Sequence, residues 1–120
     1  MAIKKESILK NKSYKFAVRI VRLSQYLHQE KKEFVLNKQI LRSGTAVGAI
    51  IREAEFAQST ADYINKFSIA LKEANETDYW LSLLCDTEYI ENKLYESLSN
   101  DCKELISILV STIKTLKTKT

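Results

Sequence analysis

The chain has 120 residues and a formal net charge of +4, with 45% hydrophobic and 28% charged residues. This length fits one domain, and this composition excludes a disordered chain. Two glycines and no proline are too few turn residues for a sheet protein, so we expect long helices joined by short polar loops.

Three features of the sequence indicate the cellular compartment of the protein: its N-terminus, its apolar runs and its two cysteines. The basic segment 1–15 lacks the apolar stretch of a signal peptide, and no run reaches the 18 apolar residues of a membrane span. Cys85 and Cys102 fall on the apolar sides of two expected helices, which is typical of reduced, buried thiols. We therefore expect a cytoplasmic protein that does not contact a membrane.

Charge is unevenly distributed along the chain. Residues 1–42 carry 11 Lys/Arg against 3 Asp/Glu, residues 43–101 carry 4 against 11, and residues 102–120 carry 4 against 1. The acidic middle could be neutralised by neighbouring helices within the fold. The surplus of cations at both ends could instead form a basic surface for a polyanion.

The first helix is expected to follow a polar, basic segment. We expect residues 1–12 to form a frayed arm, ahead of a bundle that covers residues 13–117. Ser13 is a candidate N-cap for a helix over residues 14–29. The core face of this helix is spaced four, three and four, as a helix requires, and holds Phe16, Ile20, Leu23 and Leu27.

Cations alternate with aromatic residues along this first helix: Lys12, Lys15, Arg19 and Arg22 with Tyr14, Phe16 and Tyr26. Such a pattern binds nucleic acid where the cations lie outside and the rings are free to stack. It also occurs where the rings are core and the cations are merely solvated. These four cations, with Lys114 and Lys117 near the C-terminus, are the candidate nucleic-acid-binding residues. His28 is the one histidine, so the sequence predicts no metal site.

A second helix is expected over residues 38–57, with Asn37 as its cap. Its core stripe holds Ile40, Val47, Ile51 and Ala54. Gly44 and Gly48 lie four residues apart on another face, where they permit close approach of a neighbouring backbone. Each glycine costs up to about 1 kcal/mol in a helix interior, so packing or a local kink should explain both.

A third helix, capped by Ser59 or Thr60, is expected to end near Tyr89. Its apolar residues cover well over half of the helix surface, more than in a surface helix of a monomer. Contact with both the bundle core and a further layer or subunit would explain this. A fourth helix is expected over residues 94–116. Four helices and three short loops predict an all-α fold, an antiparallel up-down-up-down four-helix bundle.

Glu73 falls inside the wide apolar sector of the third helix, beside Trp80. A carboxylate there requires a partner, because an unpaired charge in an apolar setting costs several kcal/mol. A catalytic acid and a structural ion pair both fit this position. We expect Arg42 to pair with Glu53, Glu73 or Glu76 at a buried or intersubunit position.

Two segments carry a family resemblance. RSGTAVGAIIREA (42–54) followed by NKFSIALKEANETDYWLSLL (65–84) resembles the bacterial intervening-sequence proteins of large-subunit, 23S ribosomal RNA. The resemblance covers roughly residues 13 to 117 and includes Arg42, Glu53, Glu73, Glu76 and Trp80. The chain departs from it at Ile50, where the family usually has Asn. If that Asn serves a polar network or a ligand, this protein has altered it.

The resemblance implies a four-helix bundle that assembles with itself, typically as a ring of five. A related accessory protein of diversity-generating retroelements has the same bundle, forms a basic pentamer and binds nucleic acid and a reverse transcriptase. The resemblance does not imply an enzyme, and the ribosomal label reflects gene context more than a demonstrated activity.

Three functions are compatible with these features. The first is a non-enzymatic homo-oligomer that binds RNA or another nucleic acid through a basic surface. The second is a protein-interaction scaffold without nucleic-acid affinity. Independently of this choice, we expect structural or interface roles for Arg42, Glu53, Glu73, Glu76, Trp80, Gly44 and Gly48. The third, a carboxylate enzyme, is disfavoured because a helical di-metal site usually needs Glu-x-x-His pairs. We therefore expect no catalytic residue, metal or cofactor.

Overall fold

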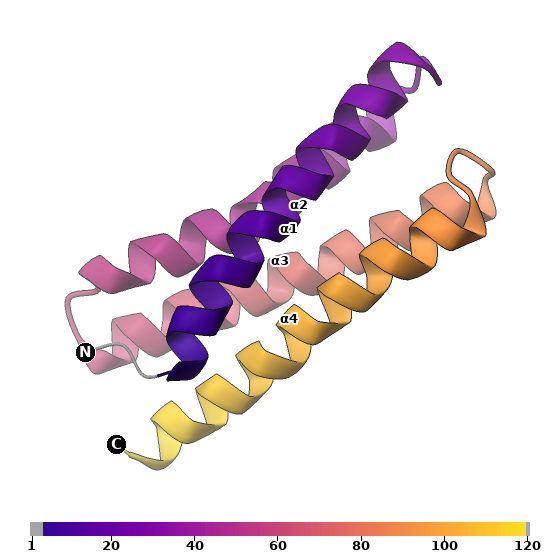
Figure 1. The fold of residues 1–120 in the computed structure, drawn as a ribbon. Coiled ribbons are helices and arrows are strands. Elements are labelled where there is room, and N and C mark those ends of the chain that lie inside the picture. Colours follow the sequence, from indigo (N-terminus) through magenta and orange to yellow (C-terminus); the bar gives the residue numbers. More distant parts are fainter. Residues whose placement is uncertain (1–3, 120) are drawn as a thin grey trace.

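The computed structural model describes residues 4–119, and this part of the chain contains helices but no strand. Four long helices follow one another: α1 (Lys4–Gln29), α2 (Val35–Glu53), α3 (Thr60–Asp86) and α4 (Asn92–Thr118). A short 3₁₀ helix, η1 (Ala54–Phe56), extends α2. Figure 1 shows the start of α1 and the end of α4 at the same end of an elongated molecule. The predicted all-α fold with four helices is confirmed.

The first helix begins ten residues earlier than predicted. Residues 4–12, expected to be a frayed arm, form the first turns of α1. Leu9 is fully buried because it continues the face of Phe16 and Ile20 toward the N-terminus, so packing holds these turns in the bundle. Ser13 is not an N-cap but a buried residue inside the helix, where its hydroxyl donates to the Lys10 carbonyl oxygen. Residues 1–3 of the expected arm lie outside the described residues.

Hydrogen bonds at the helix starts show which residues cap α2 and α3. Asn37 is not the cap of the second helix, because α2 already begins at Val35 and Asn37 is buried inside it. The carboxylate of Glu33 instead accepts the Asn37 backbone N–H at 2.8 Å. The Ser59 cap of α3 is confirmed, since its side chain accepts the Asp62 N–H at 3.0 Å.

Two other bounds shift by a few residues. α3 ends at Asp86 rather than near Tyr89, and α4 extends the fourth predicted helix by two residues at each end, from Asn92 to Thr118.

One continuous core runs along the bundle, and all four helices contribute to it. Its largest fully buried side chains are Phe16, Phe67, Leu9, Ile20, Leu27, Ile40, Leu81, Leu84, Leu98, Leu105, Leu109 and Val47. Each such side chain stabilises the fold by about 1.5–3 kcal/mol relative to an exposed position. The predicted core stripes of the first two helices are all buried.

Contacts between α1 and α2 run in opposite residue order, as for two helices that run in opposite directions. The pairs are Ser24 with Asn37, Ile20 with Gly44, Ser13 with Gly48 and Lys10 with Glu55 of η1. The two glycines lie where α1 and α2 approach each other closely, so the close packing predicted from their spacing is present. Methyl groups at these positions would lie 2.8 Å from Ile20 and 3.2 Å from the Ser13 carbonyl oxygen.

α4 contacts both α3 and α1 in opposite residue order. Its pairs with α3 are Asn92 with Cys85, Tyr95 with Ser82, Ser99 with Asp78 and Cys102 with Ala74. Its pairs with α1 are Asp101 with Arg19, Glu104 with Lys12, and Ser111 and Thr115 with Lys5. The contacts with α1 are polar and partly exposed, and they join cations of α1 to two carboxylates and two hydroxyl groups of α4.

Candidate functional site

Arg42 of α2 joins two carboxylates of α3. Its guanidinium donates to Glu73 at 3.1 Å and to Glu76, whose carboxylate also accepts the indole N–H of Trp80 at 2.9 Å. The hydrogen bonds from Trp80 and Arg42 lower the pKa of Glu76, and those to Glu76 and Glu73 raise the pKa of Arg42. We call these four residues the Arg42 cluster.

The Arg42 cluster confirms the predicted pairing but not all of its details. Arg42 pairs with Glu73 and Glu76, whereas Glu53 is exposed and has no ion-pair partner within residues 4–119. In the single chain the cluster lies at the surface, with the side chains of Arg42, Glu73 and Glu76 51%, 21% and 36% exposed. Exposed ion pairs contribute at most about 1 kcal/mol, so stability alone explains little of this arrangement.

Ile50, where the resembling family usually has Asn, packs against the core from a partly buried position in α2. An apolar side chain suits that environment, and the substitution leaves no unpaired polar atom there.

Two of the predicted nucleic-acid-binding cations are held by α4. Lys12 pairs with Glu104 at 3.2 Å, and Arg19 pairs with Asp101 at 2.7 Å. Arg19 also donates to the Ser97 hydroxyl at 3.0 Å. These cations stabilise the contact between α1 and α4 and are partly neutralised by it.

The other predicted cations are exposed but do not form one cluster with these two. Lys15 and Arg22 lie on the exposed side of α1, with no ion-pair partner within the described residues. Lys114 and Lys117 are exposed near the end of α4. At a rise of 1.5 Å per residue, Lys114 lies about 20 Å farther along the axis of α4 than Asp101, the partner of Arg19. The basic residues therefore divide into a group on the middle of α1 and a group at the end of α4.

A different set of cations gathers around Tyr14, between α1 and the end of α2. Lys10, Tyr14, Lys15 and Arg52 line one hollow, and Lys10, Tyr14, Arg52 and Phe56 line the next. We call these five residues the Tyr14 surface. Arg52 and Phe56 were missed as site residues. The signal for Phe56 was an aromatic residue outside the core stripe of the second helix, but only the structure shows it beside Tyr14.

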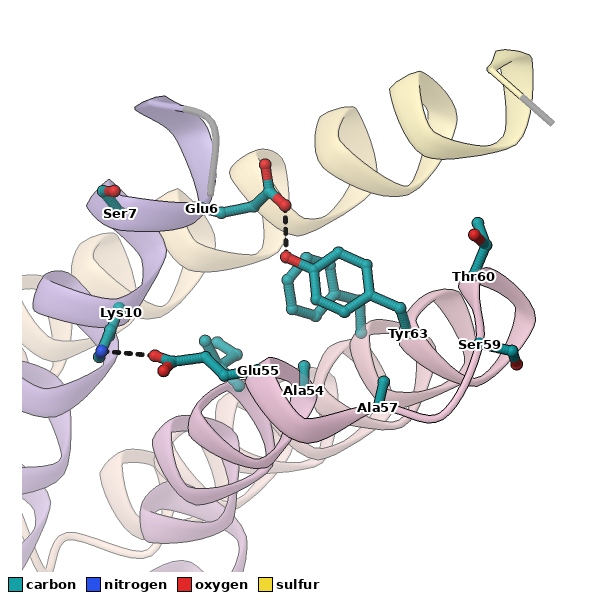
Figure 2. A pocket seen from close by; sticks show the side chains of 11 residues that line it. Glu6, Ser7, Lys10, Ala54, Glu55, Ala57, Ser59, Thr60 and Tyr63 are labelled. Atoms are coloured by element: carbon teal, nitrogen blue, oxygen red, sulfur yellow. Dashed lines mark hydrogen bonds and ion pairs between the residues drawn. The ribbon is translucent and has the colours of Figure 1, made fainter. Parts of the chain in front are cut away.

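A hollow of about 570 Å³ lies between the start of α1, η1 and the start of α3. Figure 2 shows the side chains that line it. The Tyr63 hydroxyl donates to the buried carboxylate of Glu6, and Lys10 pairs with Glu55 nearby. Burial, with the negative charge of Glu6, raises the pKa of Tyr63, so the phenol stays a donor at neutral pH. This contact ties the first turn of α1 to α3 and explains part of the order of residues 4–12.

The described chain shows no arrangement of metal ligands. Within residues 4–119, no three His, Cys, Asp or Glu side chains lie close enough together to hold a metal ion. None of the helices described is long and apolar enough to cross a membrane.

Comparisons with known proteins agree with this fold. The family model described as "23S rRNA-intervening sequence protein" matches residues 5–111. The crystal structure of a protein with unknown function from the S23 ribosomal protein family of Bacteroides thetaiotaomicron is similar, with a TM-score of 0.90 and 62% sequence identity. The match covers 92% of this chain and 98% of that one, whereas no curated protein matches. This chain therefore belongs to the 23S rRNA-intervening sequence protein family.

Proposed function

We propose that the protein is a non-enzymatic homo-oligomer of antiparallel up-down-up-down four-helix bundles that binds RNA or another nucleic acid through a basic surface. The observation that carries this proposal is the charge of α1, which has seven Lys/Arg and one acidic residue. Lys15 and Arg22 on that helix are exposed and have no ion-pair partner within residues 4–119. Phosphate groups would provide the missing counter-charge. The opposite order of contacts along neighbouring helices supports the topology.

Self-assembly is supported by apolar side chains on two sides of the bundle. Val18 and Val21 are exposed on α1, and Ile69 and Tyr79 are exposed on α3. Surfaces of this kind commonly mark contacts between proteins. The resemblance noted above suggests a ring of five chains, and the Arg42 cluster beside Ile69 would fix the orientation of one subunit on the next. Light scattering that gives one chain mass, 13.8 kDa, would refute assembly.

Nucleic-acid binding is tested by fluorescence anisotropy with a labelled RNA hairpin at low and at physiological salt. We expect binding that weakens steeply with salt, because each phosphate contact releases a counterion. Reversing Lys15 and Arg22 together to Glu should abolish it. Reversal of Lys72 and Lys93, exposed lysines on α3 and α4, is the matched control and should have little effect. Arg19 is unsuitable for this test because its loss would also weaken the contact of α1 with α4.

A protein scaffold without nucleic-acid affinity is the second candidate, and the exposed Val18 and Val21 favour it. A pull-down from nuclease-treated lysate distinguishes the protein scaffold from the nucleic-acid-binding protein. A partner that survives the nuclease, combined with no hairpin binding at low salt, would replace the first candidate by the second. In either case we propose a cytoplasmic location, because the free thiols Cys85 and Cys102 suit a reducing compartment.

A further inference from the structure

The Tyr14 surface is built around a hollow with a floor of small side chains. α1 and α2 approach closely at Gly48, and the hollow of about 410 Å³ above it has Ala17, Thr45 and Ala49 in its lining. Tyr14 and Phe56 line the same hollow. Its volume lies in the usual range for sites that bind small molecules or parts of larger ones, about 300–1,000 Å³.

Both aromatic rings of this hollow are unusually exposed for their type. Tyr14 is 61% exposed and Phe56 is 82% exposed, although aromatic side chains gain most when they are buried. Phe56 lies at the end of η1, where no further helix covers it within the described part of the chain. Two open rings beside one hollow provide faces on which flat groups can stack.

The charges around these rings favour an anion. Lys10, Lys15 and Arg52 line a second hollow of about 270 Å³ with Tyr14. Lys10 is paired with Glu55, as Figure 2 also shows, whereas Lys15 and Arg52 have no ion-pair partner within residues 4–119. Glu53 is the acidic residue that lines the larger hollow. The surface thus places two cations that have no ion-pair partner in the described part of the chain next to two open aromatic rings.

We infer that the Tyr14 surface binds single-stranded nucleic acid, with bases stacked on Tyr14 and Phe56 and phosphates held by Lys15 and Arg52. This inference rests on the proposed nucleic-acid function and specifies both its site and its ligand. Bases of a single strand expose their faces to aromatic rings, whereas those of a duplex are stacked on one another. Stacking does not depend on base identity, so the site should accept most sequences.

The test compares three fluorescent probes of about 12 nucleotides, a length within the usual footprint of a single-strand site. They are oligo(U), oligo(dT) and a blunt RNA duplex, each titrated over a range of salt concentrations. We expect both single strands to bind more tightly than the duplex. Because the contacts proposed are to bases and phosphates, the two single strands should bind with similar affinity.

Substitutions separate stacking from charge. Tyr14→Ala and Phe56→Ala should each weaken single-strand binding by about 5- to 150-fold, the usual loss for one stacked base, with the salt dependence unchanged. Lys15→Gln and Arg52→Gln should instead reduce the slope of log K against log salt by about 0.7 each, because each removes one phosphate contact. Phe34→Ala, which removes an exposed ring from the loop between α1 and α2, is the matched control and should bind like the wild type.

The outcomes distinguish this inference from the proposed function. If no probe binds at low salt, both are overturned. If the probes bind but Tyr14→Ala and Phe56→Ala behave like Phe34→Ala, or the duplex binds as well as the single strands, only the inference fails. Light scattering on the same variants completes the test. A change in mass on loss of Tyr14 or Phe56 would identify this face as a subunit contact and overturn the inference.

Discussion

Gly44 gives the sharpest test of how the bundle is packed. Replacing it with Ala would place a methyl group 2.8 Å from both Cγ1 and Cγ2 of Ile20. Carbon atoms at optimal separation lie about 3.5–4.0 Å apart, so the two helices would have to separate by about 0.7 Å. Ile20 cannot relieve the clash by turning, because it is β-branched and fully buried.

Two opposing effects determine how much Gly44→Ala changes the free energy of unfolding. Overpacking of this kind typically costs about 1–3 kcal/mol, whereas Ala is favoured over Gly in a helix by about 0.8–1.0 kcal/mol. Gly48→Ala is the matched control, since it gains the same helix propensity in the same helix. Its methyl group would lie 3.2 Å from the Ser13 carbonyl oxygen, a contact that a shift of a few tenths of an ångström relieves. We expect Gly44→Ala to be less stable than Gly48→Ala by about 1 kcal/mol or more.

Urea unfolding followed by circular dichroism measures this difference, which corresponds to roughly 4 °C in Tm for a chain of this size. Combining Gly44→Ala with Ile20→Ala should cost less than the sum of the single substitutions, by about 0.5–3 kcal/mol, because the new methyl group then has space. Equal stability of the two Gly→Ala variants, or strict additivity with Ile20→Ala, would refute the packing of α1 on Gly44.

Three other substitutions test polar contacts. Asn37→Ala should destabilise the fold by about 1–3 kcal/mol in urea unfolding, because it leaves the buried hydroxyl of Ser24 without its 2.6 Å partner; an unchanged midpoint would contradict that contact. Arg42→Gln should cost about 1 kcal/mol or less at pH 7 and low salt, and nothing at high salt. The loss of stability caused by Arg42→Gln should also shrink as the pH falls below 4.5, the ordinary pKa of Glu76, and vanish below the lower pKa that Glu76 has in the folded state. Protonated Glu76 no longer carries the negative charge that pairs with Arg42. Burial raises the pKa of Cys102 from 9.0 to about 12, so the folded state retains a proton that the unfolded state loses. Between pH 9 and about pH 12, the free energy of unfolding of the wild type should fall relative to that of Cys102→Ala by up to about 1.4 kcal/mol per pH unit. If the unfolding free energies of the two proteins change in parallel with pH, the thiol of Cys102 is not buried.

The helices could be predicted from the sequence because apolar spacing reports burial directly. Ile40, Val47 and Ile51 have the period of a helix whatever their neighbours are, and all three are buried. Caps were less predictable, because a polar residue near a helix start can serve either the cap or a buried contact. Ser13 and Asn37 both do the second. Asn37 bonds to Ser24 on α1, a partner that local sequence could not identify.

The candidate site was predictable where it depended on burial and unpredictable where it depended on register between helices. Glu73 needed a partner because of its position in an apolar sector, and the structure provides Arg42. Which cations of α1 would face acidic residues depended instead on the alignment of α4 with α1. The alignment of α2 with α1, in turn, decides that Arg52 and Phe56 lie beside Tyr14.

The cations of α1 lie in two rows with different surroundings. Lys5, Lys12 and Arg19 are seven residues apart, so they repeat on one side of the helix, and all three contact α4. Lys15 and Arg22 are also seven residues apart, but their row is turned by about 60° from the first and stays exposed. Within the described residues, Glu104 and Asp101 of α4 neutralise Lys12 and Arg19 of the first row, the Ser111 and Thr115 hydroxyls accept from Lys5, and no acidic residue pairs with the second row. One basic helix can therefore hold the bundle together with one row and keep the other available for a polyanion, so its charge need not be assigned to only one of these tasks.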